Sequence, residues 1–263
     1  MDATTAERGV AALRMLSSLG WAIGPALGAV LVSYRGYPGV FLGAAVCIVI
    51  SLVTVLVSGI WRLPESARAA TMPETVSVPK GRAALAVGSI GLFHMAMFMG
   101  SIALSITLVE GLGGNESDVG LLFSLCAALE VLVMGCFVIR PTRGSRRLWM
   151  LSGFALFALY FVLLIVFPTL AMAYWAQIPR AAAIGIVSIV GMIYLQSLMP
   201  SRVGLAAALF SNAVSVGAIL SGALTGPWAS AFGYASVFGL CVALTISGAV
   251  LILMPSSRDG QLT

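Results

Sequence analysis

Three ionisable side chains lie inside long apolar stretches of the sequence, and they are the residues best placed to do chemistry. They are His94, Glu130 and Arg180. A charged group near the centre of a lipid bilayer costs at least about 2.5 kcal/mol on insertion scales. Such groups therefore face a cavity, a bound solute or one another, and all three are candidates for solute binding or proton transfer.

Glu130 and Arg180 carry opposite charges, and an ion pair between them would offset part of the desolvation cost of each. Two interpretations stay open. The two residues either form a polar centre that hydrogen-bonds a substrate or takes part in proton coupling, or they only orient neighbouring helices. Gln177 precedes Arg180 by three residues, a spacing that places both side chains on one face of a helix.

His94 and Asn212 complete the set of candidates. A lone histidine can relay protons near neutral pH, but a hydrogen-bonded packing histidine is the favoured interpretation among its Met and Phe neighbours. Asn212 is the only amide in its apolar stretch. It is therefore predicted to face a cavity or a neighbouring helix.

Motifs of soluble enzymes are missing from the sequence. Lys80 is the only lysine and follows Pro79, so there is no phosphate-binding Gly-Lys-Ser/Thr loop, and a single histidine excludes an H-E-x-x-H zinc site. We therefore expect no enzymatic activity, no cofactor and no metal. Nucleic-acid binding is not expected either, because the basic residues lie between apolar stretches and do not form one patch.

The elements that position these residues are predicted to be membrane-spanning helices. Of the 263 residues, 60% are hydrophobic and 9% are charged, and the mean hydropathy is +1.07. That balance is typical of integral membrane proteins, and long apolar runs without alternation favour helices over a barrel. Eight spans are predicted, at 12–33, 38–61, 84–108, 117–139, 148–167, 170–198, 203–226 and 231–254.

The basic residues predict how these spans are oriented. If the spans alternate in direction, one side receives twelve of the 14 Lys and Arg residues and the other receives Arg35 alone. By the positive-inside rule the crowded side is cytoplasmic. Both termini and the polar stretch 62–83 are therefore expected in the cytoplasm, with the spans crossing the lipid bilayer of the cell (inner) membrane.

Gly20, Gly24 and Gly28 recur every four residues in the first span, so they fall on one face of a helix. Pro25 lies in the same run, where a proline removes a backbone donor and bends the helix. Small residues let a second helix approach closely in a bilayer. We predict that these four residues form a helix-packing motif, with general small-residue packing as the alternative.

The sequence also resembles itself at an offset of 197 residues. Gly20, Ala26 and Leu27 match Gly217, Ala223 and Leu224, and the Gly-Tyr-x-x-Val-Phe run at 36–41 recurs at 233–238. The first two spans therefore recur as the last two, as in transporters built from two similar halves. Chance similarity between glycine-rich apolar segments is the alternative.

With these motifs the chain resembles the major facilitator superfamily, and within it the bacterial sugar efflux transporters. The glycine and proline run at 20–28 is similar to a motif on the superfamily's fifth helix. Gly191-Met-Ile-Tyr-Leu-Gln-Ser-Leu-Met-Pro200 is similar to the tenth helix of the sugar efflux transporters. Phe210-Ser-Asn212 resembles their eleventh helix, and Ala128-Leu-Glu130 resembles their eighth.

The resemblance implies an all-α integral membrane protein with a major facilitator fold of eight transmembrane helices. Residues 1–61 would be the last two helices of an N-terminal half, 62–83 a cytoplasmic linker, 84–254 a six-helix C-terminal half and 255–263 a cytoplasmic tail. About four helices would then be missing from the N-terminus, by comparison with two halves of equal size. One hypothesis is that they form a separate partner chain.

The function that the resemblance implies is secondary active export of sugars or similar small solutes by alternating access, with proton coupling. Alternatives are a multidrug-type facilitator exporter and a truncated fragment that does not transport. The fifth helix of the family packs on the eighth, so the glycine face of 12–33 is expected to meet 117–139. Two positions differ, because the family has an arginine where Ser215 stands and a neutral residue where Arg180 stands.

Overall fold

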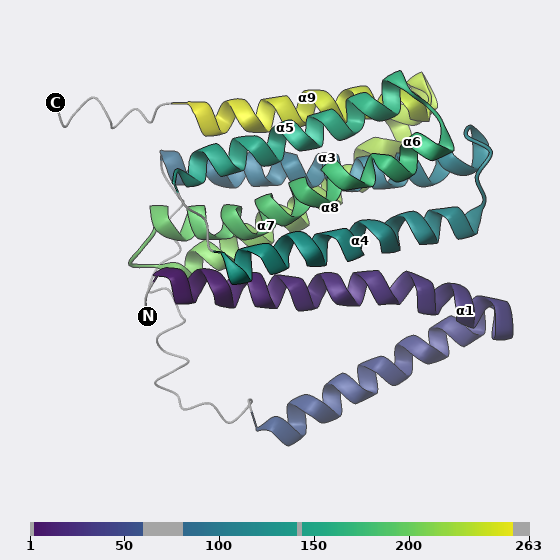
Figure 1. Cartoon of the computed structure of the whole chain (residues 1–263), viewed down its shortest axis with the longest axis horizontal. Coiled ribbons are helices and arrows are strands. Elements are labelled where there is room, and N and C mark those ends of the chain that lie inside the picture. The colour runs from purple at the N-terminus through teal and green to yellow at the C-terminus, as the bar shows by residue number, and fades with distance from the viewer. Residues whose placement is uncertain (1–2, 60–80, 141–143, 255–263) are drawn as a thin grey trace.

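The computed structural model describes residues 3–59, 81–140 and 144–254, apart from a number of side chains before residue 34. Within these ranges every regular element is an α-helix, and the helices lie roughly along one direction (Figure 1). The elements are α1 (Ala3–Ser58), α3 (Arg82–Glu110), α4 (Glu116–Ile139), α5 (Arg146–Val166), α6 (Leu170–Trp175), α7 (Gln177–Leu198), α8 (Val203–Phe232) and α9 (Tyr234–Leu253).

Seven helices in the described part of the chain are long and apolar enough to cross a membrane. They correspond to the last seven predicted spans, and the first predicted span, 12–33, lies in the helical first part of α1. The predicted all-α membrane architecture is thus confirmed. Most of the predicted linker 62–83 and the whole tail 255–263 fall outside the described residues, so the proposed domain boundaries stay predictions.

A glycine separates the helices of both pairs that the internal repeat relates. Gly36 interrupts α1 with φ 63° and ψ −169°, and Gly233 separates α8 from α9 with φ 79° and ψ 157°. This backbone region is open almost only to glycine, because a Cβ atom would clash there. The two glycines match at the 197-residue offset, so the repeated sequence encodes the same local break twice.

Two local features position the helices that carry the candidate residues. At the start of α4, the Asn115 side chain accepts bonds from the Ser117 and Asp118 amides, and the Asp118 carboxylate accepts one from the Asn115 amide. This capping box satisfies amides that have no partner inside the helix. The predicted span 170–198 is divided at Ala176 into α6 and α7, three residues before Pro179, which cannot donate to the preceding turn.

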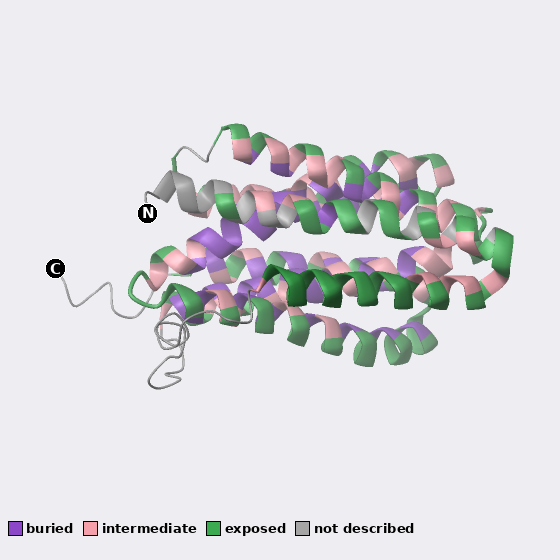
Figure 2. Cartoon of the chain, turned by 90° about the horizontal axis from the view of Figure 1, so that it is seen from below, coloured by how far each residue is buried: buried purple, intermediate pink, exposed green. Residues whose placement is uncertain are grey.

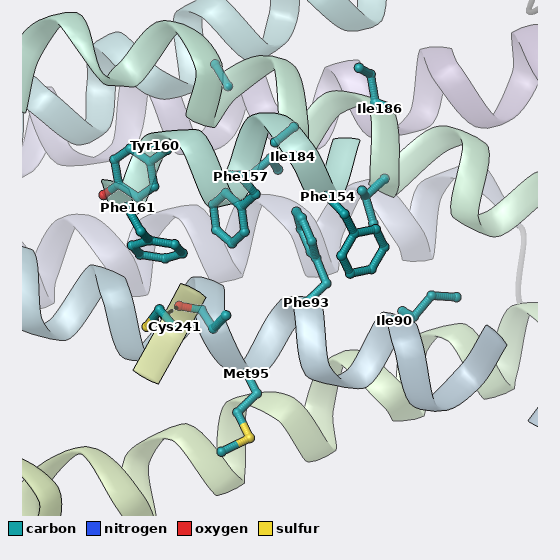
Figure 3. Packing of buried hydrophobic residues seen from close by; sticks show 14 of the residues in the cluster. Ile90, Phe93, Met95, Phe154, Phe157, Tyr160, Phe161, Ile184, Ile186 and Cys241 are labelled. Atoms are coloured by element: carbon teal, nitrogen blue, oxygen red, sulfur yellow. Dashed lines mark hydrogen bonds between the residues drawn. The ribbon is translucent and has the colours of Figure 1, made fainter. Parts of the chain in front are cut away.

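The most buried helices are α3 and the α6–α7 span. Four aromatic side chains of α5 (Phe154, Phe157, Tyr160 and Phe161) form the centre of the core beside Phe93 of α3 (Figure 3). The Phe93 ring centroid lies 4.5 Å from that of Phe157 and 5.4 Å from that of Phe154. Such edge and tilted contacts between aromatic rings add to the gain from tight packing.

The first part of α1 lies along α4, whereas the part after Gly36 leaves the bundle (Figure 1). The most apolar part of residues 34–58, which is long enough to cross a membrane, has no buried residue. Figure 2 shows this segment almost entirely as exposed. Its mean hydropathy of 2.9 is the highest of the seven candidate spans. A helix that is apolar all round and meets no protein is suited to contact with lipid or with further helices.

Residues 12–33 pack against 117–139 as predicted, but the prediction that they do so through the glycine face is wrong. The two segments do pack, but through Ser18, whose hydroxyl donates to the Glu130 carboxylate. A Cβ atom built at Gly20, Gly24 or Gly28 would meet nothing within 4 Å. The reason is geometric, because residues follow at about 100° around a helix and Gly20 is therefore about 200° from Ser18. The backbone of α1 stays helical past Pro25, and Gly36 is its first non-helical residue.

Candidate functional site

A cavity of about 520 Å³ lies between the helices at mid-length of the bundle, and it receives three of the predicted residues. Its walls come from α1, α3, α4, α7 and α8. They are formed by Ser17, Ser18, His94, Met97, Phe98, Ser101, Phe123, Cys126, Ala127, Glu130, Met134, Arg180, Ile184, Ser188 and Val214. An apolar cavity with a few convergent polar groups is the usual form of a small-molecule site.

Arg180 on α7 is 4% exposed and is held by neutral partners. Its two terminal nitrogens donate to the Gln177 side-chain oxygen at 3.0 Å and to the Ser101 hydroxyl of α3 at 2.7 Å. The guanidinium carbon also lies 4.9 Å from the ring centre of Phe123 and 5.6 Å from that of Tyr160. Aromatic faces stabilise a cation at such distances, so a buried positive charge is positioned without a carboxylate.

Glu130 on α4 lies in the wall of the same cavity and is half-buried. Its carboxylate accepts a hydrogen bond from the Ser18 hydroxyl of α1 at 3.0 Å and a longer one from the Cys126 thiol at 3.5 Å. Among the described residues no ion pair within 4.0 Å joins Glu130 to Arg180. The predicted polar centre is therefore two separate charged groups that face a common space.

His94 on α3 is 4% exposed and lines the cavity. Its Nδ1 is 2.8 Å from the Ile90 carbonyl oxygen one turn earlier, so Nδ1 carries the proton in this contact. Its ring meets those of Phe93 and Phe210 edge-on, at centroid distances of 5.4 and 5.8 Å. These contacts agree with the packing interpretation of this histidine.

The structure brings Gln177 to the site but leaves Asn212 outside it. The Gln177 amide donates to the Ala173 carbonyl while its oxygen holds Arg180, so both functional groups of this side chain are used. Asn212 on α8 is exposed and does not line the cavity. Its role stays a prediction that the described contacts do not support.

Sequence reasoning missed several of the cavity residues. Ser101 lies seven residues, about two helical turns, after His94, and Cys126 lies one turn before Glu130, so helical spacing alone would have found both. Ser18 carries no such signal, because its partner Glu130 is 112 residues away in the sequence. No group of three or more His, Cys, Asp or Glu side chains in the described part of the chain is arranged to hold a metal ion.

These helices and this cavity define a multi-pass membrane protein with a polar site between its spans. Residues 86–261 match the sequence model of the Major Facilitator Superfamily. The match covers more than half of the chain, so the protein belongs to the Major Facilitator Superfamily.

Three curated relatives of the chain are named as sugar efflux transporters. The chain is 34% identical to a provisionally assigned sugar efflux transporter of Deinococcus radiodurans, over 96% of this chain and 66% of that protein. It is 30% identical to sugar efflux transporter A of Escherichia coli, over 94% of this chain and 63% of that protein. A sugar efflux transporter A of Dickeya chrysanthemi is also 30% identical, with coverages of 90% and 61%. The chain thus spans less than two thirds of the length of these relatives.

Proposed function

We propose that the chain carries the substrate cavity of a secondary transporter that exports sugars or similar small solutes by alternating access. The observation that supports this most strongly is the mid-bundle cavity, in which Arg180 and Glu130 are both buried or half-buried and are not paired with each other. Keeping two separate charges away from water is costly unless a bound solute forms hydrogen bonds or ion pairs with them. The sugar efflux transporters among its relatives supply the solute class.

Arg180 is proposed to hold the solute. A guanidinium has five N–H donors, and the contacts to Gln177 and Ser101 leave donors that can bond to sugar hydroxyls. Those same two contacts fix the orientation of the guanidinium plane, and the ring of Phe123 covers one side of it. The aromatic and aliphatic walls of the cavity would then pack against the apolar face of a sugar ring.

Glu130 is proposed to couple transport to proton movement. An ionised carboxylate only accepts hydrogen bonds, whereas a protonated one also donates. Because Ser18 lies on α1 and Glu130 on α4, a proton on Glu130 changes the hydrogen bond that links these two helices. Binding of a proton would thereby favour a different packing of α1 against α4, which is the kind of shift that alternating access needs.

Counterflow of a labelled sugar in proteoliposomes that contain the full chain tests the proposal. We expect Arg180→Ala to lower the initial rate at least about tenfold, since a hydrogen bond to a charged group is worth about 1.5–3 kcal/mol. Arg140→Ala removes an exposed arginine of the same bundle and should leave the rate unchanged. Counterflow that is equal in wild-type, Arg180→Ala and protein-free vesicles would contradict the proposal, provided that both proteins keep their helical circular-dichroism signal.

We place the protein in the cell (inner) membrane with both termini and the 62–83 linker in the cytoplasm. The support is the distribution of basic residues, of which twelve of 14 fall on one side of the predicted spans. The long apolar helices of the structure are compatible with this orientation. The mid-bundle cavity would then open alternately to the cytoplasm and to the outer side.

A further inference from the structure

A second cavity is lined by residues at the starts of α3 and α5 and at the ends of α7 and α9. Figure 1 shows these four helix termini at the same end of the bundle. The volume of this cavity is about 480 Å³. Arg82 at the start of α3 and Arg146 and Arg147 at the start of α5 contribute guanidinium groups to its wall, and Tyr194 and Ser197 of α7 contribute hydroxyls. The solute cavity shares none of these residues.

The charged side chains that the structure describes in this cavity wall are all positive. No Asp or Glu is among the described residues of its wall, where Arg82, Arg146 and Arg147 lie. The first residues of α3 and α5 add to this, because helix N-termini carry partial positive charge and free amides. Neither N-cap, Gly81 or Ser145, satisfies these amides with its side chain. Such an arrangement favours a bound anion.

One arginine is fixed in place and still has a donor to offer. A terminal nitrogen of Arg147 donates to the Leu253 carbonyl at the end of α9, which ties the guanidinium across the cavity wall. The Nε atom of Arg147 is buried and has no hydrogen-bond partner in the described part of the chain. Buried donors are almost always satisfied in folded proteins. An oxyanion in the cavity would supply the missing acceptor.

We propose that this cavity binds a phosphate group. Two neighbouring arginines present planar donor forks that match the oxygens of phosphate, and the Tyr194 hydroxyl adds a further donor. The cavity lies where helices end, which in the orientation proposed above is the cytoplasmic headgroup layer, and basic pockets between helices on that side are suited to anionic lipids. The wall also includes Leu251, an aliphatic surface for the lipid part. The phosphate can therefore come from a phospholipid headgroup or from free inorganic phosphate.

Binding to the detergent-purified full chain, measured by native mass spectrometry, tests this site with three probes: phosphatidylglycerol, phosphatidylcholine and inorganic phosphate. We expect phosphatidylglycerol to bind at least about tenfold more tightly than phosphatidylcholine, and the Arg146→Gln, Arg147→Gln double variant to lose that difference. Arg140→Gln, a variant outside the cavity, should bind like the wild type. Arg146→Gln alone keeps the contact between Arg147 and α9, so it tests the site even if the double variant does not fold.

The probes also separate the two sources of phosphate. Preference for phosphatidylglycerol that depends on Arg146 identifies a lipid headgroup. Binding of inorganic phosphate that depends on Arg146, without a preference between the two lipids, identifies a soluble ligand and still supports a phosphate site. Equal binding of all three probes by wild-type and Arg146→Gln protein, or no binding by either, would overturn the proposal.

Discussion

At the scale of single residues, the mid-bundle cavity depends on how each charged side chain is held. Arg180 is held by a glutamine, a serine and two aromatic rings, and Glu130 by a serine and a cysteine. Each charge thus has neutral partners of its own, which leaves both available to a solute or a proton. A direct ion pair would instead have tied them to each other and favoured a purely structural role.

His94 gives a prediction that separates packing from proton transfer. Its ring fills space between Phe93 and Phe210, so His94→Ala should lower stability by about 2–5 kcal/mol, the range for large-to-small changes in a core. The loss is measured as a lower midpoint of unfolding in detergent. If the ring only packs, the pH dependence of sugar efflux should not change in His94→Gln, and a shifted pH profile in that variant would show that the histidine carries a proton.

The pairing of Gln177 with Arg180 was predictable, because a separation of three residues on a helix determines which side chains meet. The partners of Glu130 were not, since Ser18 comes from another helix and a hydroxyl in an apolar run has no distinctive pattern. An ion pair between Glu130 and Arg180, which the sequence left open, is not among the described contacts. Opposite charges in different helices suggest a pair, but the rotation of each helix decides whether they touch.

At the scale of elements, glycine has different uses at different places in the chain. Gly36 and Gly233 adopt a backbone conformation that breaks a helix, and Gly217 lets α8 approach α3 closely. The glycines of the first span do neither, because their face of α1 is turned away from α4. Spacing placed those glycines on one face correctly, but it could not say which way that face points, since this depends on contacts made by Ser18.

Gly217 gives the prediction for helix packing. A Cβ atom there would lie 2.8 Å from the Gly91 carbonyl oxygen and 2.8 Å from the Met95 amide nitrogen, both backbone atoms of α3 that cannot rotate away. Gly217→Ala should therefore push the helices apart and cost about 1–3 kcal/mol, the usual range for overpacking. Gly222→Ala on the same helix meets nothing within 4 Å and is the matched control. Equal melting temperatures in detergent for the two variants would show that α8 does not pack on α3 as described.

At the scale of the whole molecule, composition and hydropathy alone predicted a helical membrane protein, because twenty-residue apolar stretches have few other uses. The superfamily match then confirmed the family. The position of the later part of α1 could not be predicted in this way. Its sequence is apolar on all sides, so no stripe indicates a neighbour, and in the structure it leaves the bundle with its side chains exposed.

The orientation of the molecule is predicted by its charges and can be tested with reporters. A green fluorescent protein fused after residue 263 should fluoresce, because the tail is expected in the cytoplasm, where that reporter folds. Alkaline phosphatase inserted in the short loop 111–115 between α3 and α4 should be active, because the proposed topology puts this loop on the opposite side from the linker that precedes α3. Active phosphatase at the C-terminus and an inactive insertion at 111–115 would reverse the proposed topology.

The account as a whole depends on Glu130 linking a proton to movement of solute through the cavity. The most direct measurement is uptake of a labelled sugar into proteoliposomes that contain the full chain, with and without an imposed pH gradient. We predict that the gradient drives accumulation in the wild type, and that Glu130→Gln abolishes this accumulation but keeps counterflow without a gradient, because glutamine keeps an acceptor for Ser18 and cannot ionise. Accumulation by Glu130→Gln at the wild-type rate would contradict the account.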